Sequence, residues 1–91
     1  MQVDKNKLEL FKHAVGEVLK ELRQADVGVS MSKRAREYEF DKGSLSKIER
    51  GVYDCRLSTI WVLCEINSVS FPEFASRLEE KLGTDFKFMD E

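Results

Sequence analysis

The sequence predicts a compact all-α domain of five short helices with a short C-terminal tail. Three observations support this fold class. Apolar residues recur at intervals of three and four in several segments, as they do on one face of an α-helix. The connections between these segments span about two to six residues, a usual length in helical bundles. From residue 1 to residue 83, no segment shows a convincing strand pattern.

The first predicted helix covers residues 7–25. Its apolar side chains step by three and four along one face, and they are Leu8, Phe11, Val15, Val18 and Leu22. Charged and polar residues occupy the opposite face. We expect the helix to end near residues 26–28, because Gly28 suits the left-handed conformation that follows many helices.

The second predicted helix is short and covers about residues 31–38. Ser30 is a good N-cap for it, and Ser32 is a weaker one. Ala35 is a small residue in the middle of this segment, and such a residue lets another helix approach closely. We therefore expect the second helix to pack tightly against a neighbour.

The third predicted helix covers about residues 42–50. Asp41 is its N-cap, because a carboxylate satisfies free backbone N–H groups at a helix start. Leu45 and Ile48 lie three apart and are expected to face inward. Gly51 is expected to end the helix.

The last two predicted helices have equally clear limits. The fourth has apolar residues at helical spacing, namely Leu57, Ile60, Trp61 and Cys64. Residues 67–68 are expected to break it. The fifth begins with a capping box formed by Ser70 and Glu73, has a proline in its first turn, and ends at Gly83.

We expect one domain over residues 1–83 and a tail over residues 84–91. A chain of 91 residues buries only about two-thirds of its unfolded surface, which makes a monomer marginally stable and favours an oligomer. In the tail, Phe86 and Phe88 flank a lysine. This alternation predicts either an edge strand or a hydrophobic hook.

Composition argues against several functional classes. No apolar run approaches the ~20 residues of a membrane span, and the N-terminal residues lack the apolar core of a signal peptide. We therefore expect a cytoplasmic protein. Cys55 and Cys64 lack partners at zinc-site spacing, so we expect free thiols and no metal. His13 is the single histidine, and we expect neither catalysis nor a cofactor.

Positive charge is concentrated in the middle of the chain. The formal net charge is −2. Residues 30–56 hold seven basic and five acidic side chains, whereas residues 57–91 hold three basic and seven acidic ones. The asymmetry is modest, and charge alone does not predict a polyanionic partner.

The arrangement of the second and third helices is more informative. Two short helices joined by a tight turn, the second polar and basic at its start, form a helix-turn-helix. The major groove of DNA admits one α-helix. The side chains placed to read base edges are Lys42, Gly43, Ser46 and Lys47. Phosphates would be contacted from helix N-termini and flanking groups, namely Ser30, Ser32, Ser44, Arg50 and Arg56.

Residues 29–74 resemble the Cro/cI-like (Xre-type) helix-turn-helix family of phage and bacterial repressors. The matching motifs are V-S-x-x-x-x-A at 29–35, S-L-S-K-I-E-R-G at 44–51, L-S-T-I at 57–60 and I-N-S-V-S-F-P-E-F at 66–74. The resemblance implies a five-helix, lambda-repressor-like DNA-binding domain. Helices two and three would be its DNA-binding pair.

The resemblance also implies roles for individual residues. In the family, a glutamate at the position of Glu49 commonly pairs with an arginine of the first helix, which maps to Arg23. The alternative is two separate surface charges. Met31 stands where the family often has a phosphate-contacting glutamine, so we include it among the phosphate contacts. Arg34 and Glu39 also depart from the usual pattern, where leucine and glycine are common.

Two functional hypotheses follow. The first is a sequence-specific regulator of transcription, a repressor, that binds double-stranded DNA as a homodimer through the fifth helix and the C-terminal tail. The tail aromatics could instead belong to the core of one chain. The second is a protein-interaction module on the same fold, such as the antitoxin of a toxin–antitoxin pair.

Overall fold

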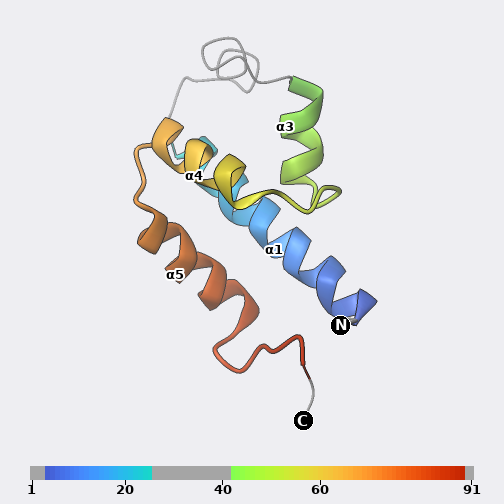
Figure 1. Ribbon diagram of the computed structural model, residues 1–91. Coiled ribbons are helices and arrows are strands. Elements are labelled where there is room, and N and C mark those ends of the chain that lie inside the picture. The colour runs from blue at the N-terminus through green and yellow to red at the C-terminus, as the bar shows by residue number, and fades with distance from the viewer. Residues whose placement is uncertain (1–3, 26–41, 90–91) are drawn as a thin grey trace.

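The computed structural model describes residues 4–25 and 42–89 (Figure 1). These residues form four helices, α1 (Lys5–Gln24), α3 (Lys42–Glu49), α4 (Leu57–Ile66) and α5 (Phe71–Leu82). They contain no strand, which confirms the all-α class. The sequence predicted five helices. The additional one, over residues 31–38, lies outside the described residues, as do Gly28, Ser30 and Asp41 with their predicted capping roles.

Helix α1 starts two residues earlier than predicted. The reason is an N-cap that the sequence reasoning missed. Asp4 has an extended backbone, and its carboxylate oxygen accepts hydrogen bonds from the backbone N–H of Asn6 at 2.8 Å and of Lys7 at 3.1 Å. A carboxylate at this position satisfies otherwise free N–H groups and interacts favourably with the helix dipole.

The predicted ends of the other helices are confirmed by their backbone geometry. Gly51 follows α3 with φ +77°, and Gly83 follows α5 with φ +90°. Helix α3 itself ends at Glu49, one residue before the predicted limit. Ser68, in the predicted break after α4, has φ +56°. At the start of α5, the Ser70 hydroxyl accepts from the backbone N–H of Glu73 at 3.3 Å.

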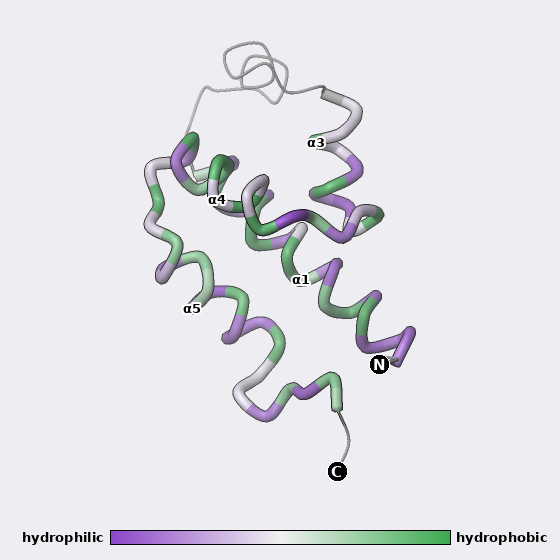
Figure 2. Tube along the Cα trace, viewed as in Figure 1, coloured by the Kyte–Doolittle hydropathy of each residue, from purple (hydrophilic) through white to green (hydrophobic). Residues whose placement is uncertain are grey.

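The hydrophobic core lies where the inner faces of the four helices meet. Its buried members are Val15, Val18, Leu19, Leu22, Leu45, Ile48, Ile60, Leu63, Cys64, Ile66 and Phe74. Helix α1 packs against both α3 and α5. Figure 2 shows hydrophilic and hydrophobic stretches alternating along α1 and α5, the pattern of helices with one buried face. The core therefore fixes α3 on one side of α1 and α5 on another.

The described part of the C-terminal tail forms a hydrophobic hook, and the alternative prediction of an edge strand is wrong. The rings of Phe86 and Phe88 lie 6.3 Å and 5.3 Å from the ring of Phe11 between centroids. They lie 5.1 Å from each other in an edge-to-face arrangement. These aromatic contacts stabilise the tail against the first turns of α1.

Two further features bear on the expected location and chemistry. Among the described helices, none has the length and apolar character needed to cross a membrane. Cys55 and Cys64 are free thiols, as predicted. Burial raises the pKa of both thiols, and for Cys55 the nearby Asp54 carboxylate adds to the effect. A raised pKa lowers the thiolate fraction at neutral pH, so neither thiol is activated as a nucleophile.

Candidate nucleic-acid interface

Helix α3 has one buried face and one exposed face. Leu45 and Ile48 are each 6% exposed and contact the core. On the opposite side, Gly43 and Lys47 lie one helical turn apart and are exposed, with Ser46 half-buried beside them. Three of the four predicted base-reading residues thus lie on or next to one accessible face. The fourth, Lys42, is the first residue of the helix.

The predicted phosphate-contacting residues divide into two groups. Arg50 and Arg56 are exposed after the C-terminal end of α3, and Ser44 is half-buried within the helix. The guanidinium of Arg50 donates to the carbonyl oxygen of Ser46 at 3.4 Å. Ser30, Met31 and Ser32 lie outside the described residues.

Lys47 is positioned by an aromatic residue that the sequence reasoning missed. Its ammonium nitrogen lies 5.5 Å from the centroid of the Tyr53 ring, within the range of a cation–π interaction. The turn after α3 explains this proximity, because the N–H of Val52 donates to the carbonyl of Lys47 at 2.9 Å. Gly51 permits that turn. In the sequence, this glycine was the indication that the chain turns back toward Lys47 after the helix.

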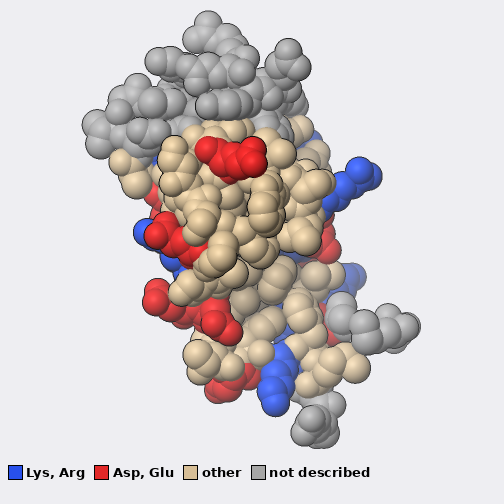
Figure 3. All heavy atoms as spheres, turned by 60° about the vertical axis from the view of Figure 1, so that its left-hand side comes forward, with Lys and Arg blue, Asp and Glu red and all other residues tan. Residues whose placement is uncertain are grey.

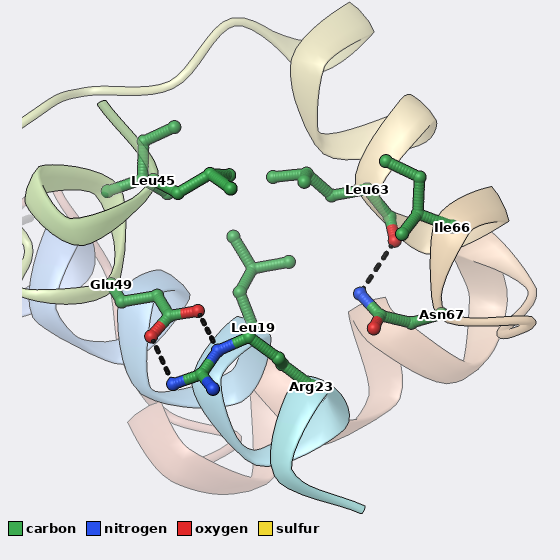
Figure 4. A pocket seen from close by; sticks show the side chains of 8 residues that line it. Leu19, Arg23, Leu45, Glu49, Leu63, Ile66 and Asn67 are labelled. Atoms are coloured by element: carbon green, nitrogen blue, oxygen red, sulfur yellow. Dashed lines mark hydrogen bonds and ion pairs between the residues drawn. The ribbon is translucent and has the colours of Figure 1, made fainter. Parts of the chain in front are cut away.

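The predicted ion pair between Arg23 and Glu49 is present and joins α1 to α3 (Figure 4). Arg23 Nε donates to Glu49 Oε2 at 2.7 Å, and Nη2 donates to Oε1 at 2.9 Å. The side chains retain 17% and 10% of their exposure, respectively. The hydrogen bonds to Glu49 raise the pKa of Arg23, although partial burial opposes the shift. The alternative of two separate surface charges is therefore wrong.

Helices α1 and α3 also touch through their backbones. A Cβ atom on Gly16 would lie 2.6 Å from the carbonyl oxygens of both Ile48 and Glu49. A Cβ atom on Gly51 would lie 2.9 Å from the Cα of His13. The sequence reasoning missed Gly16. The sequence did contain an indication of this contact. A glycine inside a helix costs about 1 kcal/mol of stability relative to alanine, so its presence usually means that another segment packs closely there.

These contacts determine which charges α3 presents to solvent. Glu49 is the single acidic residue of α3, and its carboxylate is bound to Arg23 at the contact with α1. Over residues 43–56, the exposed charges are Lys47, Arg50 and Arg56 against Asp54. The exposed side of this region is therefore positive, although the whole chain is slightly acidic.

A small cavity lies behind α3, between α1, α3 and α4 (Figure 4). Its volume is about 20 Å³, and its apolar lining includes Leu19, Leu45 and Leu63. The Asn67 amide is at its edge and donates to the carbonyl of Leu63 at 2.8 Å. Pockets that bind cofactors or substrates typically measure about 300 Å³ or more. This cavity is thus a packing feature rather than a ligand site.

Comparison of the chain with family models, curated proteins and solved structures gave no match. The resemblance to the Xre-type family stays a prediction from sequence motifs.

Proposed function

We propose that this protein is a sequence-specific double-stranded DNA-binding regulator of transcription, a repressor that acts as a homodimer. In this proposal, the chain adopts the lambda-repressor-like, Cro/cI-like arrangement and inserts α3 into the major groove. One observation supports it above the others. Helix α3 turns its single carboxylate, Glu49, toward Arg23 and presents Gly43 and Lys47 to solvent.

The exposed face of α3 has the chemistry that base edges require. The ammonium of Lys47 can donate to the O6 and N7 atoms of guanine, and the hydroxyl of Ser46 can donate or accept. Gly43 has no side chain, so it lets the helix backbone approach a base pair closely. Arg50 and Arg56 are exposed beyond the helix and can neutralise phosphates.

The attachment of α3 to α1 also favours recognition. A bidentate ion pair and two close backbone contacts hold the helix on its scaffold. A group that is already fixed in its bound orientation loses less conformational entropy on binding. The Tyr53 ring, 5.5 Å from the ammonium of Lys47, adds a weaker preference for one orientation of that side chain.

Selection from a pool of random duplex DNA tests this proposal directly. We expect enrichment of a near-palindromic site, with half-sites about 34 Å apart if two copies of α3 enter successive major grooves. The logarithm of the affinity for that site should fall with the logarithm of salt concentration, at a slope of about −0.9 per phosphate neutralised. Absence of enrichment at low salt would overturn the proposal.

Substitution of Lys47 by alanine tests the role of α3. If Lys47 contacts a base, Lys47→Ala should relax the preference at one position of the site and weaken binding by about 1–3 kcal/mol. A uniform loss across all sequences would instead assign Lys47 to phosphate contact. Lys20→Ala is the matched control, because Lys20 is an exposed lysine on α1. It should leave the selected site unchanged.

A further inference from the structure

Helix α4 is apolar on its outer face as well as on its inner face. Its inner residues Ile60, Leu63, Cys64 and Ile66 are buried in the core. Its outer residues Leu57, Trp61 and Val62 are 64%, 52% and 40% exposed. Ser58 and Glu65 are the other exposed residues of α4, so three of its five exposed residues are large and apolar. The outer face of α4 therefore has the character of an interface.

The exposed apolar residues form a continuous surface with α5. Leu57, Trp61 and Glu65 follow one another at four-residue intervals, so they line one ridge of α4. The Trp61 ring stacks on Phe71 of α5, with 5.4 Å between centroids and an interplanar angle of 20°. Figure 3 shows a largely uncharged area on this side of the molecule, with one acidic group in its upper part and further charged groups beside and below it.

We propose that this surface binds a second copy of the chain, with the two α4 helices packed antiparallel across a two-fold axis near Trp61. The proposal rests on the homodimer in the proposed function and specifies its interface. Phe86 and Phe88, which the sequence assigned in one alternative to a dimer contact, pack against Phe11 of their own chain. On the α4 face, Trp61 meets Phe71 of its own chain and still keeps 52% of its surface exposed.

The charges at the two ends of α4 favour this occupant. Arg56 is the N-cap residue, and its side chain makes no capping hydrogen bond. The start of α4 therefore has free N–H groups and an exposed guanidinium, both of which attract an anion. Glu65, the single charged residue within α4, lies near the opposite end and is exposed.

Antiparallel pairing brings these complementary ends together. At a rise of about 1.5 Å per residue, Glu65 lies about 6 Å along the axis from Trp61 on one side, and Arg56 lies about 7.5 Å from it on the other. A two-fold axis near Trp61 then places Glu65 of each copy beside Arg56 and the free N–H groups of the other copy. An isologous contact requires a self-complementary patch of this kind. Gly43 and Lys47 lie outside this patch, whereas Arg56 belongs both to the patch and to the proposed phosphate contacts. Self-association is therefore tested without DNA.

A charge swap at the two ends tests the interface by sedimentation equilibrium without DNA. The wild-type chain should dimerise in the micromolar range. Glu65→Arg and Arg56→Glu should each raise the dimer dissociation constant about 100-fold, because each creates two like-charge contacts per dimer. The double variant, with both charges exchanged, should restore dimerisation to within about tenfold of the wild type.

Both substitutions preserve the helix of the monomer. Glutamate at the start of α4 and arginine near its end each match the sign of the helix dipole. Unchanged circular dichroism and thermal unfolding would confirm that the single variants are folded. Lys20→Glu, a charge reversal on the exposed face of α1, is the matched control and should leave the dissociation constant unchanged.

Two results would overturn the inference. One is a wild-type chain that stays monomeric throughout the micromolar range, which would leave a different protein as the occupant of this face. The other is a double variant that dimerises no better than the single variants. The proposed function fails separately. A monomer that still enriches a DNA site overturns the interface and the homodimer but leaves DNA binding, and a dimer that enriches no site overturns only DNA binding.

Discussion

Helix α1 is held by polar contacts on two sides, and the two sets differ in their exposure to water. Toward α3, Arg23 and Glu49 form a bidentate pair whose side chains are 17% and 10% exposed. Toward α5, Lys81 lies 2.7 Å from Glu21 and 3.3 Å from Glu17, whose side chains are 50% and 62% exposed. A pair largely removed from water has a fixed geometry and is costly to break. Solvated pairs exchange readily with water and contribute little.

The packing contacts of α1 also differ between its two sides. Toward α3, Gly16 allows the helix backbone to approach the carbonyl oxygens of Ile48 and Glu49. Toward the tail, Phe11 meets Phe86 and Phe88 through side chains alone. Side chains can repack, whereas two backbones in contact cannot. The contact of α1 with α3 is therefore more strictly determined than its contact with the tail, as expected if α3 must present Lys47 in one position.

The largest expected effect comes from removal of one partner of the buried pair. Arg23→Met leaves the Glu49 carboxylate partly buried without its counter-ion, and we expect a loss of about 2–4 kcal/mol of unfolding free energy. Urea denaturation would measure it. The double variant Arg23→Met, Glu49→Leu should recover most of the loss, because no unpaired charge remains. Two single losses that simply add in the double variant would contradict this account.

A smaller but still substantial effect is expected at the backbone contact. Gly16→Ala introduces a Cβ where it would meet two carbonyl oxygens at 2.6 Å. We expect a destabilisation of about 1–3 kcal/mol, since α3 must shift away from α1. Lys20→Ala, an exposed position on the same helix, should change stability by less than about 0.5 kcal/mol. If Gly16→Ala were instead stabilising by about 1 kcal/mol, as helix propensity alone predicts, the close contact would be irrelevant to stability.

The features predicted correctly from the sequence are those with local signals. Gly51 and Gly83 mark helix ends through their backbone preferences, and Ser70 marks a helix start through its side-chain hydroxyl. The limits they predicted agree with the structure to within one residue. The predicted start of α1 is wrong because the apolar pattern begins only at Leu8, whereas the helix is capped by Asp4. The sequence did not decide between an edge strand and a hydrophobic hook for the tail, because two phenylalanines around a lysine fit both equally well.

The site was predicted less completely, since its geometry depends on contacts between distant segments. The pair between Arg23 and Glu49 was expected from a family resemblance rather than from any local pattern. The contact of Gly16 with the end of α3 depends on which face of α1 meets that helix. The position of Tyr53 over Lys47 depends on the path of a turn. Periodicity identifies a buried face but does not specify its partner.

The smallest expected effect concerns the exposed side of α1. Lys81→Gln removes contacts with Glu21 and Glu17, and we expect a lower melting temperature by a margin well below that of Arg23→Met. The hydrogen bonds to Glu21 and then Glu17 raise the pKa of Lys81 above its ordinary value of 10.5. The folded chain therefore binds this proton more tightly than the unfolded chain does. The difference between variant and wild type should be fully present below pH 10.5 and should vanish as pH rises through the raised pKa.

Thermal unfolding at several pH values and salt concentrations would measure this difference. Salt should reduce it, because exposed charges are screened, whereas the effect of Arg23→Met should change little with salt. A salt-insensitive loss at Lys81 as large as the loss at Arg23 would mean that both sides of α1 are fixed equally. In that case, the orientation of α3 would not be the special feature of this domain.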